Sequence, residues 1–248
     1  MRLSVPSYVI PGTYLENLQH LEPFSHIQGV ELLFFFYDEQ TKDLLDAEWD
    51  GIQKLADRFF YTIHLPDVVY AHHEELVDRF SSLATHYIVH PPRYADSPSL
   101  KEFLPRWRAT YGDRFLLENT TMKNFLHAEP ELDHIPICCD LGHLMLEHAS
   151  VMDFLGRYED RIKQIHLHDV VIQDGKPVDH KALQPSSIQP DGWITEISPW
   201  MSNFQGVLEL EVFHYNDVNQ SCQLLTDLSI LKNSWTEIPA GKGSLWCS

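Results

Sequence analysis

The chain has 248 residues, of which 44% are hydrophobic, and its formal net charge at pH 7 is −18. This length suits a single domain spanning 1–248 with one buried core. Such an acidic chain disfavours a long nucleic acid as partner, because binding to a phosphate backbone depends on Lys and Arg. No apolar run reaches the roughly 20 residues of a membrane-spanning helix. We therefore expect no membrane partner.

The cysteine content and the N-terminal sequence predict the compartment. Four cysteines are few for this length, and Cys138 and Cys139 are adjacent within one apolar run, where they cannot easily pair with each other. The first residues show no basic leader followed by an apolar stretch. Together these features predict reduced thiols and a cytoplasmic protein.

Apolar runs of strand length alternate with amphipathic segments along the chain. Strands are predicted at 2–10, 29–36, 60–64, 86–90, 114–119, 135–140, 162–169 and 206–213. Helices are predicted at 13–22, 46–59, 71–83, 99–112, 121–128 and 150–160, and from a cap at Asn216 to about Ser234. This alternation predicts an α/β fold, the (β/α)₈ TIM barrel. A doubly wound sheet would usually carry a Gly-rich phosphate loop after its first strand, which this chain lacks.

Two segments fall outside this alternation. The stretch 171–205 is predicted to be a long irregular loop, of the kind that carries specificity at the C-terminal face of a barrel. Its aromatic residues Trp193, Trp200 and Phe204 either line a large hydrophobic ligand or cover the barrel as core. The tail 236–248 is predicted to be ordered only by local packing.

Six of the predicted strands end in a histidine or a carboxylate. These residues are His64, His90, Glu118, Asp140, His166 and Glu211. The C-terminal ends of parallel barrel strands surround one pocket. A single histidine at a strand end is usually structural, but six such residues at corresponding positions predict one metal-rich site. A buried carboxylate needs a cation or hydrogen bonds, and Arg93 is the main basic residue that could instead pair with Glu118.

Period-two geometry adds neighbours to this set. His168 shares a strand face with His166, and Glu209 shares one with Glu211, so one member of each pair can be a ligand while the other packs above or below it. His143 lies in the first turn after its strand. The ring nitrogen that faces away from a metal needs an acceptor, for which Asp169 and Glu209 are candidates.

The ligand set resembles that of the xylose-isomerase-like barrel superfamily, and most closely the endonuclease IV-like group (AP endonuclease family 2). The resemblance implies one metal held by His64, His90 and Glu118, and a second held by Glu118, Asp140, His166 and Glu211, with Glu118 bridging. It implies a third metal at His143 and His180. The hydrolase pattern there is Asp, any residue, His, whereas this chain has Val178-Asp179-His180, which leaves the third metal open.

A narrower resemblance covers almost the whole chain. The segments CCDLGHLMLE, IHLHDV with GKPVDHKAL, and GVLELEVF are similar to the cobamide-remodelling phosphodiesterases of this superfamily. These enzymes cleave the phosphodiester in the nucleotide loop of a corrinoid. The resemblance implies a small-molecule substrate, one to three divalent ions (zinc or manganese) and Glu118, Glu211 and His168 as catalytic residues.

Three other functions stay open. Sugar isomerases and epimerases of the superfamily usually keep only the central Glu, Asp, His, Glu set and act on sugar-like substrates with one metal. His64 and His90 therefore favour the multi-metal hydrolases. An abasic-site endonuclease uses a similar ligand set, but the charge argues against it. A barrel that binds a metal or ligand without turnover is the remaining alternative, and the sequence does not predict the oligomeric state.

Overall fold

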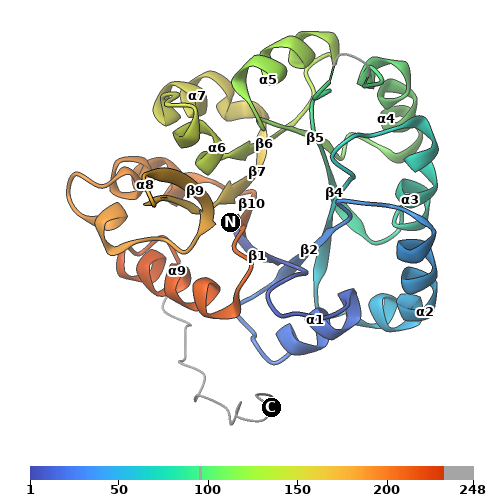
Figure 1. Ribbon diagram of the computed structural model, residues 1–248, viewed down its shortest axis with the longest axis horizontal. Helices are drawn as coiled ribbons and strands as arrows, with labels where there is room; N and C mark the ends of the chain where they lie inside the picture. The colour runs from blue at the N-terminus through green and yellow to red at the C-terminus, as the bar shows by residue number, and fades with distance from the viewer. Residues whose placement is uncertain (95–96, 232–248) are drawn as a thin grey trace.

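The computed structural model describes residues 1–94 and 97–231, so the predicted tail 236–248 lies outside the described residues. Eight parallel strands close into a barrel with helices around its outside (Figure 1). The barrel strands are β1 (Arg2–Pro6), β2 (Gly29–Leu33), β3 (Phe60–His64), β4 (Ala84–Val89), β5 (Phe115–Glu118), β6 (Ile137–Asp140), β7 (Ile162–Leu167) and β10 (Val207–Leu210). Each strand pairs with its neighbours in this order, and β10 closes the ring against β1. The predicted (β/α)₈ barrel is confirmed.

The helices fall between the strands, as a barrel of this type requires. The α-helices are α1 (Tyr14–Leu21), α2 (Glu39–Leu55), α3 (Glu74–Arg79), α4 (Leu104–Tyr111), α5 (Met122–Ala128), α6 (Leu141–Leu146), α7 (Val151–Tyr158), α8 (Trp193–Asn203) and α9 (Tyr215–Asp227). Short 3₁₀ turns lie at η1 (Ala71–His73), η2 (Leu100–Glu102), η3 (Glu129–Glu131), η4 (Glu159–Arg161) and η5 (Pro185–Ile188). Within the described residues, no helix is long and apolar enough to cross a membrane.

The barrel interior is unusually polar below the strand ends. Five polar side chains, one from each of five strands, are fully buried there, and they are Ser4, Glu31, Thr62, Gln164 and Glu209. Glu31 Oε2 accepts hydrogen bonds from Thr62 Oγ1 at 2.9 Å and from Gln164 Nε2 at 2.5 Å. The other side of the interior is apolar, with Ile88, Leu116 and Cys138 in one cluster. Side chains thus fill the lower barrel, and the candidate site lies above them.

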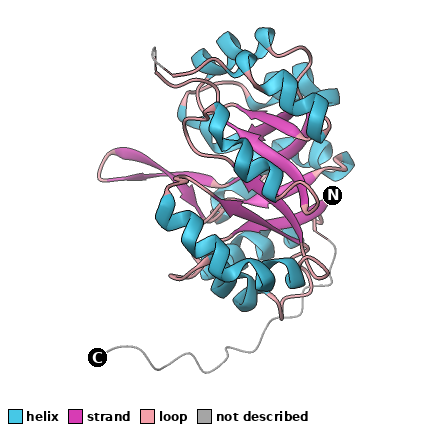
Figure 2. Ribbon diagram, turned by 90° about the vertical axis from the view of Figure 1, so that its right-hand side faces the viewer, coloured by secondary structure: helices cyan, strands magenta, loops and turns pink. Residues whose placement is uncertain are grey.

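The segment predicted to be irregular contains regular structure. An antiparallel hairpin, β8 (Asp169–Gln173) and β9 (Lys176–Lys181), follows β7, and α8 occupies much of the remainder. Asp174 and Gly175 form its two-residue turn and both have positive φ, as such turns require. Figure 2 shows the hairpin projecting from the barrel on the side away from the N-terminus. The predicted long loop is therefore wrong over these residues.

The bounds of some elements also differ from the prediction. The seventh barrel strand ends at Leu167, and the short helix α6 was not predicted. The last helix begins at Tyr215 after His214, two residues ahead of the start that a cap at Asn216 would give.

Trp200 and Phe204 stack on each other at 5.2 Å near the start of β10, at the end of the barrel opposite the strand-end residues. They pack against the core rather than line the site.

Candidate metal centre

Glu118 occupies the middle of the site at the end of β5. Its Oε2 lies 3.1 Å from His90 Nε2 and 3.4 Å from His64 Nε2. Its Oε1 lies 3.7 Å from Nδ1 of His166. One carboxylate oxygen therefore faces a pair of histidines and the other faces the end of β7. The side chain is almost wholly buried, so these histidines surround it in place of water.

A second group of ligand-type atoms surrounds the end of β6. Glu118, Asp140 and His166 place one such atom each within 4.8 Å of one another, as do Asp140, His168 and Glu211. His166 Nδ1 lies 3.3 Å from Oε2 of Glu211. The six predicted strand-end residues, spread over about 150 positions of sequence, thus belong to groups that share Glu118 and Asp140.

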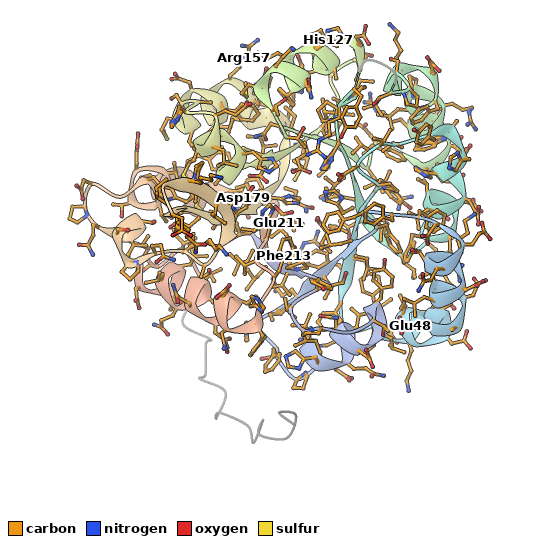
Figure 3. The ribbon with its side chains drawn as sticks, in the orientation of Figure 1. Glu48, His127, Arg157, Asp179, Glu211 and Phe213 are labelled. Carbon is orange, nitrogen blue, oxygen red and sulfur yellow. The ribbon has the colours of Figure 1, made fainter. Side chains whose placement is uncertain are left out.

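The third group involves the hairpin. His143, His168 and His180 place ring nitrogens within 4.8 Å of one another. His180 comes from β9, and its Nε2 lies 3.5 Å from Oε2 of Glu211. Asp179 Oδ1 contacts the other nitrogen of His180 at 3.2 Å. Figure 3 places Asp179, Glu211 and Phe213 close together near the barrel axis. The chain has Val at position 178, and the carboxylate of the next residue, Asp179, contacts His180.

The unbonded atoms of these groups fit divalent cations. Asp140 Oδ2, His166 Nδ1 and Glu211 Oε2 are buried and make no hydrogen bond to any described residue. The nearest groups to these carboxylate oxygens are imidazole rings, at 3.3 Å for Glu211 and 3.6 Å for Asp140. A buried carboxylate oxygen without a hydrogen bond is costly, and a cation removes that cost. A mixed set of imidazole nitrogens and carboxylate oxygens suits zinc or manganese. Burial raises the pKa of the Cys138 thiol well above its usual value, so thiolate ligation is disfavoured.

Two of the ligand-type histidines, His64 and His90, have an acceptor on the far side of the ring. His64 Nδ1 donates to the carbonyl of Leu65 at 2.9 Å. His90 Nδ1 lies 3.4 Å from Asp67 Oδ1. Such contacts turn the remaining ring nitrogen toward a metal position and raise its basicity. In both rings that remaining nitrogen is Nε2, the atom that faces Glu118.

Glu31 plays this part for His166, and the sequence did not single it out. His166 Nε2 lies 3.3 Å from Glu31 Oε2, which leaves Nδ1 facing Glu118 and Glu211. The available signal was one carboxylate in the middle of the buried run GVELLFFF. The two residues predicted for this role do not fill it. Asp169 instead accepts from the backbone of Gln184 at 2.9 Å and from Ser187 in the segment after the hairpin.

Glu209 is a buried acid of a different kind. Burial, reinforced by the nearby charge of Glu31, raises its pKa well above the usual value, which favours the protonated form. It makes no hydrogen bond to a described residue. Arg93, the alternative partner for Glu118, pairs with Asp67 at 2.8 Å instead. Arg93 is therefore not the partner of the Glu118 carboxylate.

His168 differs from the other histidines in its hydrogen bonding. The backbone N–H of His180 donates to Nδ1 of His168 at 3.0 Å. In the neutral ring this places the proton on Nε2, which lies 3.3 Å from Asp140 Oδ1 and 4.0 Å from Glu211 Oε2. The ring then presents an N–H rather than a lone pair to the centre. This arrangement supports its predicted catalytic role over a role as ligand.

Asn119 and Gly142 position the end of β6. The Asn119 side chain donates to the Asp140 carbonyl at 2.7 Å and accepts from the Asp140 N–H at 2.8 Å. Asp140 in turn caps α6, and its Oδ1 accepts from the N–H of His143 at 2.7 Å. A Cβ on Gly142 would lie 1.9 Å from Cε1 of His168. The glycine in CCDLGH is thus required by the close approach of an imidazole.

Without metal, the histidines balance the carboxylates by holding protons. Burial alone would lower the pKa of His64, but Glu118 and its neighbours outweigh burial and raise that pKa to about 9. The pKa of His180 rises in the same way to about 10, with Glu211 as the main cause. Histidine must lose this proton to bind a metal, so metal uptake and proton release are coupled.

This coupling predicts a pH dependence of stability. A raised pKa stabilises the folded state fully below the ordinary histidine value of 6.5, and that stabilisation is lost as the pH rises through about 9 at His64 and about 10 at His180. We expect the unfolding free energy of chelator-treated protein to fall across this window, while metal-loaded protein changes less. Urea unfolding from pH 6 to about 10.5 measures both. If the unfolding free energies of chelator-treated and metal-loaded protein fall by the same amount over this pH range, the prediction is wrong.

No protein-family model matches the sequence, and no curated protein matches it. Solved structures do match. A probable 3-DHS dehydratase involved in petrobactin synthesis, from Bacillus anthracis, has a TM-score of 0.63 at 15% identity, covering 95% of this chain and 100% of that one. A 3-keto-D-glucoside 4-epimerase from E. coli has a TM-score of 0.59 at 14% identity, covering 93% and 100%.

A xylose isomerase domain protein from Alicyclobacillus acidocaldarius is also similar, with a TM-score of 0.57 at 12% identity, covering 92% of this chain and 97% of that one. At these identities the likeness concerns the fold. The topology of the closed eight-stranded barrel agrees with it. The chain therefore has a (β/α)₈ barrel fold similar to those of these three structures.

Proposed function

We propose that this chain is a metal-dependent hydrolase that cleaves a small phosphodiester. The observation that carries the proposal is the position of Glu118 between two groups of ligand-type side chains. One oxygen faces His64 and His90, and the other faces His166. A single-metal enzyme has no use for the pair of buried histidines on the far side of a central carboxylate. Two or more cations at short spacing are typical of phosphoester-cleaving sites.

The chain's own residues provide the remaining requirements of this chemistry. Bound divalent ions would activate water and offset the charge that builds on phosphoryl oxygens. Glu118 would hold an ion on each side, and Glu211 would hold the second together with His166, while its other contact is to His180 of the hairpin. The Nε2–H of His168 is placed to donate to a substrate oxygen beside Asp140. Asn119 and Glu31 hold Asp140 and His166 in orientation.

Aromatic side chains around the site support a substrate with a large apolar part. Phe35 lies 5.6 Å from the His64 ring, and Phe213 stacks on His180 at 5.0 Å (ring centroids). Tyr8 packs edge-on against Phe213, and Phe36 is 78% exposed. A cavity of about 260 Å³ lies among Tyr8, Phe35 and Phe36. A corrinoid, whose phosphodiester lies beside a broad macrocycle, has the chemistry to use both the aromatic rim and the cations.

Incubation of metal-loaded protein with adenosylcobalamin tests this proposal. With zinc or manganese bound in the centre, we expect the protein to release the lower-ligand nucleoside. Chromatography measures this release. The same reaction with the E118Q variant is the negative control. If no metal supports release, the corrinoid is wrong, and if a generic phosphodiester is also left intact, hydrolysis is wrong.

A second candidate is a sugar isomerase or epimerase that uses one metal. The comparisons favour it over hydrolysis, because the similar barrels are named as an epimerase, a dehydratase and a xylose isomerase domain protein. Glu118, Asp140, His166 and Glu211 would be sufficient for such a centre. This candidate requires one metal per chain, whereas the hydrolase requires at least two. Elemental analysis of the purified protein separates them, because a single equivalent that survives substitution of His64 and His90 excludes the multi-metal centre.

A further inference from the structure

A second cavity lies outside the metal centre and is lined by basic side chains. It has a volume of about 350 Å³ and is bounded by the segment after β4 and by α5. Arg93, Lys101 and Lys123 contribute to its lining. Figure 3 shows His127, another lining residue, at the outer edge of the molecule, away from Glu211. The cavity is therefore distinct in position from the candidate metal centre.

The charge of this cavity is opposite to that of the chain. Among the described residues, its three Lys and Arg side chains are accompanied by two carboxylates, Glu131 on the lining and Asp67 beside Arg93. The local formal charge is therefore +1 (3 − 2), on a chain whose net charge is −18. Lys101 pairs with Glu131 at 3.0 Å. Lys123 makes no ion pair with any described residue. A concave surface that concentrates one sign of charge attracts ligands of the other sign.

The lining also offers neutral hydrogen-bond donors. Ser97, Ser99 and Asn124 lie on it beside the cations. Arg93 donates to Asp67 Oδ2 at 2.8 Å, and Asp67 Oδ1 contacts the His90 ring. Guanidinium, ammonium and hydroxyl donors that line one hollow suit the several acceptor oxygens of a phosphate or carboxylate. Arg93 further connects the cavity to the His90 side of the metal centre.

We propose that this cavity binds a phosphate or carboxylate group, at a site separate from the metal centre. The group is either a second anionic part of the substrate or a free anion. Both sources share the same chemistry at Lys101, Lys123 and Arg93. The inference does not depend on hydrolysis, since the cavity would bind its anion whichever reaction the metal centre performs.

Calorimetric titration of the full-length protein with inorganic phosphate tests the site. Phosphate also binds metal ions, so the protein is titrated both metal-loaded and after chelation, and only the second titration reports on the cavity. We expect binding that weakens as the salt concentration rises. A variant combining Lys101→Gln and Lys123→Gln should bind phosphate about tenfold more weakly. The matched control combines Lys54→Gln and Lys176→Gln, on α2 and on the hairpin, and should bind as the unmodified chain does.

Absence of phosphate binding in the chelated protein, or equal binding by the cavity variant and the unmodified chain, would overturn the proposal. The source of the anion is then read from kinetics with the substrate that the centre turns over. A raised KM at unchanged metal content in the cavity variant identifies an anionic part of the substrate. If the cavity variant binds phosphate more weakly but its kinetic constants are unchanged, the ligand of the cavity is a free anion. A failed corrinoid assay would leave the phosphate titration unaffected.

Discussion

Replacing Glu118 with Gln should strip metal from both sides of the centre and reduce activity by more than about a hundredfold. Gln keeps the shape of the side chain but removes its charge, and it leaves His64, His90 and His166 facing a neutral amide. Loss of residues that merely orient ligands already costs ~10–100-fold in affinity or activity, so loss of a bridging carboxylate should cost more. Elemental analysis after gel filtration measures the metal, and turnover of the substrate measures the activity.

Glu209→Gln is the matched control for this experiment. Glu209 is as deeply buried as Glu118, in the same barrel interior, but burial raises its pKa well above the usual value, which favours the neutral form. An amide should replace a protonated carboxyl there with little change in metal content. Equal metal retention by the E118Q variant and the unmodified chain would show that Glu118 does not bridge cations. Equal loss in both variants would show that any change in the interior disrupts the site.

The sequence was informative wherever function follows from strand geometry. His64, Glu118 and Asp140 each end a short apolar run, and parallel strands in a barrel bring such ends together regardless of their separation along the chain. That relation needs no knowledge of loops, which is why both the fold and the convergence of the strand-end residues were predicted. The identity of the ions, and their binding, stay predictions.

The sequence was less informative where a role depends on partners from distant elements. Glu31 lies 135 positions from His166, and only the closed barrel shows that their side chains meet. His180 enters the site through a hairpin that was predicted to be an irregular loop. Its signal was the Asp174-Gly175 pair, which favours a two-residue turn. Asp169 was assigned to the metal centre by proximity in sequence, although its carboxylate faces the segment after the hairpin.

Gly142→Ala should lower both stability and activity, in spite of the helical position of this residue. In an open helical site, Ala is favoured over Gly by about 1 kcal/mol. Here the new Cβ would lie 1.9 Å from Cε1 of His168 and 2.4 Å from its Nδ1, the atom that accepts from the His180 backbone. Overpacking typically costs ~1–3 kcal/mol, so the collision outweighs the gain in helix propensity. The His168 ring must move, and the N–H beside Asp140 moves with it.

Gly156→Ala provides the comparison, because Gly156 lies on α7 and a Cβ there would meet nothing within 4 Å. That variant should be more stable than the unmodified chain by up to about 1 kcal/mol, with unchanged turnover. Urea unfolding of both variants, together with their metal content and turnover, gives the contrast. If G142A gains stability as G156A does, the His168 ring does not occupy the space above Gly142. If instead G142A loses activity but keeps its metal, His168 acts on the substrate through a position that Gly142 keeps open.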